Sequence, residues 1–192
     1  YYLIHNLGTK NYKTAERFGS FAFVSELKRQ GKVRKMGFFF HDSAEVLDKI
    51  LTEHPEVDFV QIQLNYLDWE SDTIQSRLCH EVCLKHGKPV IVMEPVKGGT
   101  LAKLPERVSS LLSAAHPDWS APSWAIRFAA SCENVFMVLS GMSDMDQLHE
   151  NMALMNNFVP LTDEEKQQMR EYLATHKVTV KPAESDIVFD IV

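Results

Sequence analysis

Five short apolar runs, each followed by helix-forming sequence, constrain the fold of this chain more than any other feature. They cover residues 1–5, 36–41, 57–65, 89–94 and 135–140. Each run is short and apolar on both faces, which is typical of a parallel strand covered by helices. Repeated strand–helix units connect through right-handed crossovers onto one parallel sheet. The sequence therefore predicts an α/β protein.

Polar side chains gather at the ends of the predicted strands. In parallel α/β sheets the functional groups collect at the carboxyl ends of the strands, where the loops that follow them meet. The side chains that we expect to share one site are His5, His41, Gln61, Gln63, Asn65 and Glu94.

Helical spacing follows the predicted strands. We expect helices over residues 20–30, 44–53, 73–86, 123–131, 145–155 and 162–175. Asp42 and Ser43 are the expected N-cap of the helix over 44–53, because short polar side chains accept hydrogen bonds from the first free amides of a helix. Ser143 and Asp144 are expected to cap the helix over 145–155 in the same way.

Two architectures fit this pattern: an open doubly wound sheet and a (β/α)₈ TIM barrel. No Gly-x-Gly-x-x-Gly phosphate loop follows any predicted strand, which disfavours the dinucleotide-binding open sheet. A complete barrel needs about 250 residues, so this chain of 192 fits the last five of its eight βα units. Because the first strand begins at residue 1, we expect the later part of a longer chain. We expect the partial barrel over 1–176 and a tail of unassigned role over 177–192.

Composition excludes several classes of protein. The formal net charge is -6, and no cluster of Lys and Arg forms a basic stripe, which argues against nucleic-acid binding. No apolar run approaches the roughly 20 residues that span a bilayer. Cys79, Cys83 and Cys132 are too few for a disulfide framework, so we expect a reducing compartment, the cytoplasm. Cys79 and Cys83 share a helix face without a second ligand pair, so we expect them to be structural.

Five segments occur in the order and spacing of one known family. They are Tyr2-Leu3-Ile4-His5, Gly-Lys-Val-Arg-Lys-Met-Gly-Phe at 31–38, Phe-Val-Gln-Ile-Gln-Leu-Asn at 59–65, Glu-Pro-Val-Lys-Gly-Gly-Thr-Leu at 94–101, and Ser-Gly-Met-Ser-Asp at 140–144 with Glu150 and Asn151. Together they resemble the aldo/keto reductase family from its fourth barrel strand onward, over residues 1–172. The 94–101 segment is most similar to the bacterial ferredoxin-linked branch. That branch usually carries a Cys-rich iron–sulfur segment, whereas no cysteine follows Cys132 here.

The resemblance implies reduction of an aldehyde or ketone, a small-molecule carbonyl substrate, by hydride from a nicotinamide cofactor. The cofactor is usually NADPH, with NADH as the alternative. In the family a His orients the carbonyl, and a Tyr tuned by a Lys and an Asp donates the proton. His5 matches that His. The Asp, Tyr and Lys belong to the first three strands and would lie before residue 1, so His5 is the catalytic residue that the resemblance assigns to this chain.

The resemblance also implies a set of cofactor-binding residues: Gln61, Met93, Gly141, Ser143, Asp144, Gln147, Glu150 and Asn151. Gln61 matches the residue that reads the nicotinamide amide, since its side chain offers donors and an acceptor. Residues 141–144 open a helix whose amides can hold a phosphate. Gln147 stands where NADPH-preferring members often carry an Arg, which weakens selection for the 2′-phosphate. No metal ligand set is implied.

Two other functions remain open on the sequence alone. The same fold can serve as a nicotinamide-binding regulatory or scaffold subunit with little turnover. An unrelated barrel lyase or aldolase would need a Schiff-base Lys at a strand end, and none of the five runs supplies one in its second half. The identity of the residues at the missing Asp, Tyr and Lys positions would separate the enzyme from the regulatory subunit.

An open portion of a barrel also has consequences for association. Five strands would expose two sheet edges and much of the apolar barrel interior, which favours self-association. We expect that interior to carry Ile4, Phe38, Val60, Ile62 and Val92.

Overall fold

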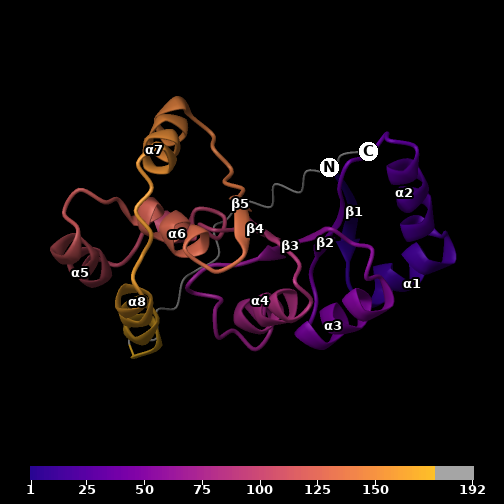
Figure 1. Ribbon diagram of the computed structural model, residues 1–192. Helices are drawn as coiled ribbons and strands as arrows, with labels where there is room; N and C mark the ends of the chain where they lie inside the picture. The colour runs from indigo at the N-terminus through magenta and orange to yellow at the C-terminus, as the bar shows by residue number, and fades with distance from the viewer. Residues whose placement is uncertain (176–192) are drawn as a thin grey trace.

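A twisted parallel sheet forms the centre of the structure (Figure 1). The computed structural model describes residues 1–175, so the predicted tail over 177–192 lies outside the described residues. The strands are β1 (Tyr2–Leu7), β2 (Met36–Phe40), β3 (Phe59–Gln63), β4 (Val90–Met93) and β5 (Val135–Val138). Each strand pairs in parallel with the next one along the chain. All five predicted strands are therefore confirmed.

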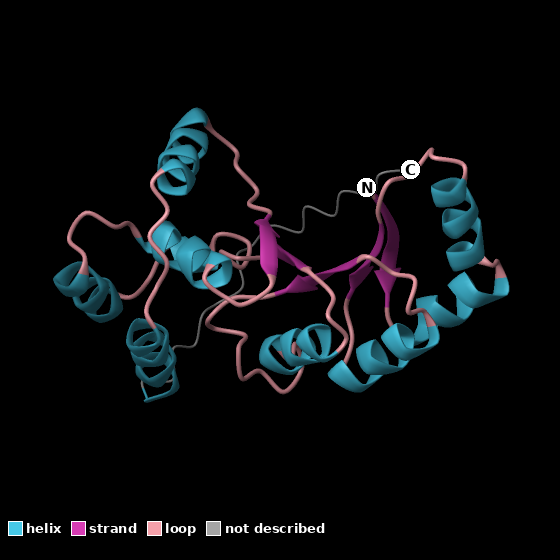
Figure 2. Ribbon diagram, viewed as in Figure 1, coloured by secondary structure: helices cyan, strands magenta, loops and turns pink. Residues whose placement is uncertain are grey.

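The order of the strands separates the two architectures. Across the sheet the order is β1-β2-β3-β4-β5, the same as along the chain. A barrel adds strands in this sequential way, whereas a doubly wound sheet reverses direction at a switch point. Figure 2 shows helices along one face of the sheet, while the centre of the opposite face carries none among the described residues. The structure thus contains five βα units of the barrel type, as predicted.

The described residues contain more helices than the sequence predicts. They are α1 (Thr9–Arg17), α2 (Ser20–Arg29), α3 (Ala44–Glu53), α4 (Ser76–Lys85), α5 (Glu106–Ala115), α6 (Ala121–Ala130), α7 (Met145–Asn156) and α8 (Asp163–Thr175), with a 3₁₀ turn η1 (Thr100–Ala102) before α5. The prediction misses α1 and α5, which bury few side chains: Tyr12 and Ala15 in the strongly polar α1, and Val108 in α5. Within this part of the chain, no helix has the length and apolarity needed to cross a bilayer.

The start of α3 differs from the predicted cap. Ser43 is the N-cap residue, but its side chain makes no capping hydrogen bond. The amide of Ala44 instead donates to Gln75 Oε1 at 2.9 Å. The carboxylate of Asp42 accepts hydrogen bonds from the amide and hydroxyl of Thr9 at 2.7 and 2.9 Å. Asp42 therefore ties the loop after β2 to the first turn of α1.

The residues predicted for the barrel interior lie on the opposite face of the sheet. Ile4, Phe38, Val60, Ile62 and Val92 are all buried in the hydrophobic core, none of them more than 9% exposed. Helices cover this face, and the ring of Phe38 packs edge-on against Phe21 of α2. The prediction was wrong because apolar residues stand on both faces of these strands, so the alternation could not show which face the helices cover.

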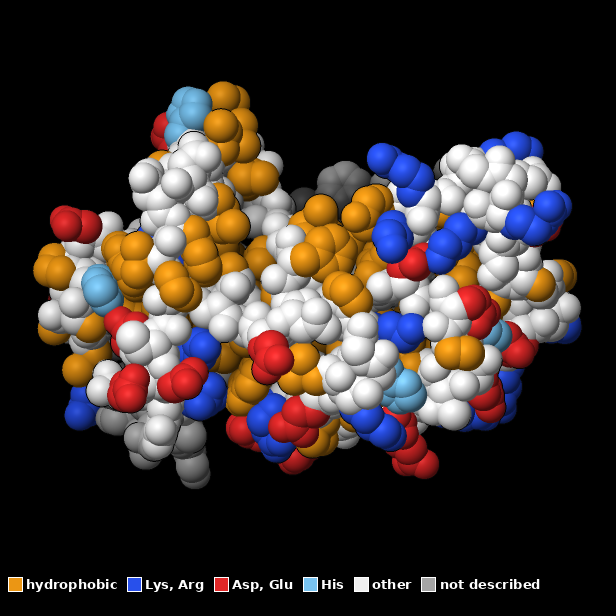
Figure 3. All heavy atoms as spheres, viewed as in Figure 1, with side chains coloured by type: hydrophobic (Ala, Val, Ile, Leu, Met, Phe, Trp, Pro, Cys, Tyr) orange, Lys and Arg blue, Asp and Glu red, His pale blue; other side chains and the backbone are white. Residues whose placement is uncertain are grey.

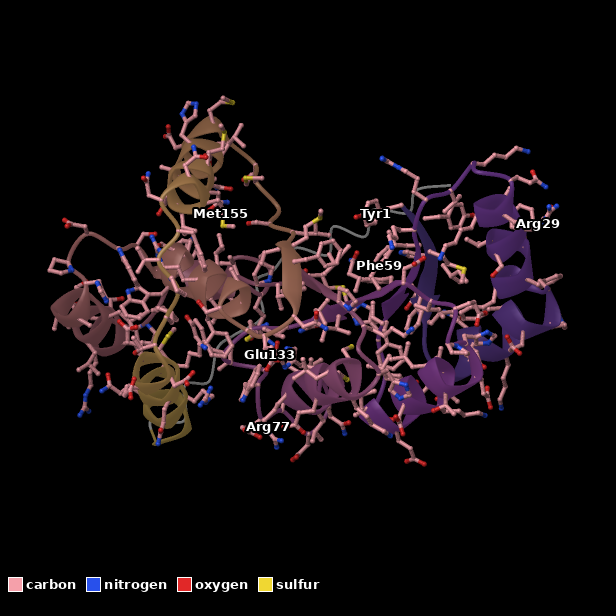
Figure 4. The ribbon with its side chains drawn as sticks, in the orientation of Figure 1. Tyr1, Arg29, Phe59, Arg77, Glu133 and Met155 are labelled. Atoms are coloured by element: carbon pink, nitrogen blue, oxygen red, sulfur yellow. The ribbon has the colours of Figure 1, made fainter. Side chains whose placement is uncertain are left out.

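The barrel-interior face carries a different set of side chains. The ring of Phe59 lies 5.3 Å from that of Tyr1 and 6.2 Å from that of Phe136. Figure 4 shows Tyr1 and Phe59 together on one side of the sheet and Arg77 on the other. Tyr1 and Phe136 are exposed, at 63% and 43%, and Figure 3 shows hydrophobic side chains gathered on this side, with charged side chains along the helices opposite.

Gly37→Ala is expected to lower the free energy of unfolding by about 1–3 kcal/mol, as overpacking of a close-packed core does. A Cβ atom at Gly37 would lie 2.5 Å from the ring of Phe59, which is buried. Urea denaturation measures the change. Gly141→Ala is the matched control, because a Cβ atom there meets nothing within 4 Å. Equal losses in the two variants would contradict the packing of Phe59 against Gly37.

Candidate active site

A β-bulge near the end of β1 sets the position of His5. From Ile4 to Leu7, β1 advances three residues while its partner strand advances two. Asn6 takes up the extra residue in the left-handed conformation, with φ of 52°, which Asn tolerates better than most residues. Bulges bend a strand and change the direction of its side chains. The His5 ring stacks on Phe39 of β2, with the ring centroids 5.0 Å apart.

Phe39 lies between two histidines. On one side it stacks on His5, and on the other the ring of His41 approaches edge-on, 4.5 Å between centroids. Burial lowers the pKa of His41, the Glu94 carboxylate partly offsets that effect, and His5 adds to it. His5 near the end of β1, His41 after β2 and Glu94 after β4 therefore lie close enough to influence one another electrostatically. They share the edge of the sheet at which the strands end.

Gln61 of β3 lies between the histidine pair and Met93 of β4. Its Cα atom pairs with that of Phe39 in the register of β2 and β3. Its side-chain nitrogen donates to the Met93 sulfur at 3.6 Å. A thioether is a weak acceptor, so the amide of Gln61 remains able to form a stronger hydrogen bond with a ligand.

A cleft of about 550 Å³ lies beyond Met93, at the ends of β4 and β5. This β4–β5 cleft is lined by Met93, Glu94, Pro95, Val96, Gly98, Gly99, Ala102, Pro122, Ile126, Leu139, Ser140, Gly141, Gln147, Glu150 and Asn151. Its volume is within the range of about 300–1,000 Å³ that is usual for small-molecule and cofactor sites. Five of the predicted cofactor residues thus meet in one cleft: Met93, Gly141, Gln147, Glu150 and Asn151.

Ser143 and Asp144 lie beside this cleft, at the start of α7, and do not line it. Asp144 is the N-cap residue, and its carboxylate accepts the amide of Gln147 at 2.9 Å and the side-chain nitrogen of Gln147 at 2.7 Å. The amide of Ser143 donates to Gln147 Oε1 at 3.0 Å. The amides of Ser143 and Gln147 are thus already paired with side chains. A phosphate bound at this point would have to replace those hydrogen bonds.

The sequence matches the profile of the aldo/keto reductase family over residues 1–174. This chain belongs to the aldo/keto reductase family. The resemblance that its five segments showed is therefore confirmed, and the family is one of oxidoreductases. Among curated proteins, no sequence matches the chain significantly.

Solved aldo-keto reductases share the fold. The chain is similar to aldo-keto reductase AKR11C1 from Bacillus halodurans in its holo form, with a TM-score of 0.66 and 23% identity over 97% of this chain and 60% of that one. It is also similar to the glycerol dehydrogenase AKR11B4 from Gluconobacter oxydans, with a TM-score of 0.66 and 20% identity over 98% of this chain and 61% of that one. This family member therefore spans about three fifths of the length of either structure.

The sequence did not point to one candidate residue of this site, Asp68. Asp68 is 4% exposed, and its carboxylate accepts hydrogen bonds from Gln63 and Asn65, both at 2.8 Å, and from Lys97 at 2.5 Å. Lys97 forms an ion pair with Asp68 and not with the nearby Glu94. A spacing of three residues between Asn65 and Asp68 just after a strand is the only sequence signal for this arrangement.

The cysteines of this chain are buried, in the case of Cys79 and Cys83, or partly buried, in the case of Cys132. Cys83 is fully buried and Cys79 nearly so, and both lie on the inner face of α4. Burial raises the pKa of Cys79 to about 12 and that of Cys132 to about 11, which keeps both thiols protonated and poorly reactive. Among the described residues, no group of three His, Cys, Asp or Glu side chains could hold a metal ion. The burial supports the structural role that we expected for Cys79 and Cys83.

Asp144→Ala is expected to lower the free energy of unfolding by about 1 kcal/mol, the usual cost of losing an N-cap hydrogen bond. Ser43→Ala is the matched control, since Ser43 occupies the same position of α3 without making a capping hydrogen bond. Its expected change is smaller than that of Asp144→Ala. Thermal or urea unfolding of both variants measures the difference, and an equal loss in the two would argue against the cap on α7.

Proposed function

We propose that this chain forms the cofactor-binding and carbonyl-orienting part of an oxidoreductase that reduces an aldehyde or ketone with a nicotinamide dinucleotide. The observation that carries the proposal is the β4–β5 cleft, because five residues that the family resemblance assigns to the cofactor line it together. Gln61 touches Met93 at the border of the cleft and pairs with Phe39, on which His5 stacks. A continuous row of side chains therefore leads from the cleft to His5.

Each residue in this row has a role that suits its chemistry. The bound cofactor supplies the hydride. The amide of Gln61 would hold the carboxamide of the nicotinamide, and the Met93 thioether would pack against the ring. The His5 ring would donate a hydrogen bond to the carbonyl oxygen, which orients the substrate and stabilises charge that develops on that oxygen.

The proton that the carbonyl oxygen receives must come from a group other than His5. The Tyr12 hydroxyl donates a hydrogen bond to the Glu53 carboxylate, and the buried ring of Tyr66 packs against Phe128. Burial raises the pKa of both phenols, and neither tyrosine lines the β4–β5 cleft. The proposal therefore assigns proton donation to the Tyr that the family places before the strand of His5, together with its Lys and Asp.

The charge of the β4–β5 cleft bears on the choice of cofactor. The resemblance alone predicts NADPH, with NADH as the alternative. The lining residues of the cleft include two acids, Glu94 and Glu150, and no Lys, Arg or His. A phosphate monoester carries a charge of about −1.5 to −2 near neutral pH and is repelled by neighbouring carboxylates. These features support NADH as the more tightly bound cofactor.

The free thiols support a location in a reducing compartment. All three cysteines are free, and none forms a disulfide. Free thiols persist in reducing compartments, whereas secreted domains tend to pair them. We therefore propose that the protein acts in the cytoplasm on a small-molecule carbonyl compound.

His5→Ala in the full-length protein is expected to lower carbonyl-reduction turnover by about 10²-fold or more, the scale of one positioned polarising or proton-transferring group. The affinity for NADH should stay within about twofold, because His5 lies outside the β4–β5 cleft. Steady-state kinetics and calorimetric titration measure the two quantities. Unchanged turnover would remove His5 from the site. Cofactor binding without turnover in the unmodified protein would instead support a regulatory or scaffold subunit.

Gln147→Arg is expected to raise the affinity for NADPH relative to NADH by about tenfold, because a guanidinium forms strong bidentate hydrogen bonds with phosphate. Calorimetric titration with NADPH, NADH and adenosine 2′,5′-bisphosphate measures the preference. Gln168→Arg makes the same change of charge on an exposed position of α8, outside the cleft, and should leave the preference unaltered. Tighter binding of NADPH than NADH by the unmodified protein would contradict the proposed preference.

A further inference from the structure

The loop after β4 holds an unusual backbone conformation. Glu94 and Lys97 have positive φ angles of 55° and 49°, and Gly98 and Gly99 follow with 57° and 84°. For residues with a side chain this left-handed conformation costs roughly 1–2 kcal/mol each, so surrounding contacts must hold it in place. We call residues 94–99 the β4 loop. Because five of its six residues line the β4–β5 cleft, its conformation sets the shape of one wall.

The side chain of Lys97 does not line the cleft. Its ammonium group lies 2.5 Å from Asp68 Oδ1 in an ion pair in which the Asp68 side chain is 6% exposed. The second carboxylate oxygen of Asp68 accepts hydrogen bonds from Gln63 and Asn65. A buried carboxylate is costly unless it is paired and hydrogen-bonded, and Asp68 has both kinds of partner.

Asn65 makes a second connection to the β4 loop. Its side-chain nitrogen donates to Asp68 and also to the carbonyl oxygen of Glu94 at 3.0 Å. Its side-chain oxygen accepts the amides of Leu67 and Asp68 at 3.1 and 2.9 Å. Asn65 is completely buried. The end of β3 is therefore fastened to the first residue of the β4 loop, while Asp68 is fastened to its fourth.

Hydrogen bonds inside the loop depend on those two anchor points. The amide of Lys97 donates to the Glu94 carbonyl at 3.1 Å, and the amide of Thr100 donates to the Lys97 carbonyl at 3.0 Å. On the cleft side, the amide of Gly98 donates to the Glu94 carboxylate at 2.6 Å. Loss of the ion pair with Asp68 would release Lys97, whose amide and carbonyl groups make the hydrogen bonds to Glu94 and Thr100.

We propose that Asp68, acting through Lys97 and Asn65, is a positioning residue that holds the β4 loop in the conformation required for the cofactor. The proposal rests on the proposed function for the identity of the ligand. Asp68 touches no ligand itself. It acts by keeping the left-handed loop populated in the free protein, so that binding does not have to order it.

The test compares Lys97→Met, which removes the ion pair and keeps most of the side-chain length, with Lys97→Arg, which keeps the charge. Lys85→Met is the matched control, because Lys85 forms an ion pair of similar length with Asp48, 2.7 Å, on the outer surface of α4. Two quantities are measured for each: the dissociation constant for NADH, by calorimetry, and the hydrogen-exchange rates of the amides of Thr100 and Leu101 in the ligand-free protein.

Lys97→Met is expected to weaken NADH binding by about tenfold, as follows when the competent loop falls to about a tenth of the population. The amides of Thr100 and Leu101 should then lose most of their protection from exchange, because the open loop would make up most of the population. Lys97→Arg should stay within about threefold of the unmodified protein, and Lys85→Met should match it. Unchanged NADH affinity in Lys97→Met would overturn the proposal, as would unchanged exchange rates.

Asp68→Asn provides an independent check, because it keeps the shape of the side chain and removes its charge. A lower midpoint of thermal unfolding with unaltered NADH affinity would make Asp68 a stabilising residue only, and would also overturn the proposal. If the unmodified protein binds no NADH, the proposed function fails. The exchange rates of the ligand-free variants would still decide whether Asp68 and Lys97 hold the loop.

Discussion

The backbone hydrogen bonds that pair β1 through β5 in parallel bring the carboxyl ends of all five strands to one edge of the sheet. Every feature of the candidate site depends on this arrangement. His5 lies near the end of β1 and Gln61 in β3. The residues after β4 and β5 contribute the walls of the β4–β5 cleft. An antiparallel sheet would have sent alternate groups to opposite edges.

The two faces of the sheet have different roles: one forms the hydrophobic core, and the other carries residues of the candidate site. On the helix-covered face, Phe38, Val60 and Val92 are completely buried and form the core with α2, α3 and α4. On the barrel-interior face, Phe39 and Gln61 are only partly buried, and both contact residues of the candidate site. Because side chains alternate along a strand, one strand can supply the core and the site at successive positions.

The sequence predicted the strands well and the helices less completely. Runs of apolar residues identified all five strands, and the predicted cap at Asp144 located the start of α7. It missed α1, because only Tyr12 and Ala15 form its buried face and polar residues dominate the rest of its sequence. In the site, the family resemblance pointed to residues that the fold brings into one cleft. It gave no indication of Asp68, since an Asp in a polar loop reads as solvent-exposed.

The sequence by itself determined the order of strands and helices, the polar residues that end the strands, and the family. These are local properties, because they depend on the spacing of residue types along the chain. Only the tertiary structure decided which face of each strand is covered and that Asp68 binds Lys97 across 29 residues. Those contacts join segments far apart in the chain or depend on side-chain direction. Their partners are fixed by the register of the sheet and the close packing of its loops, which no single segment encodes.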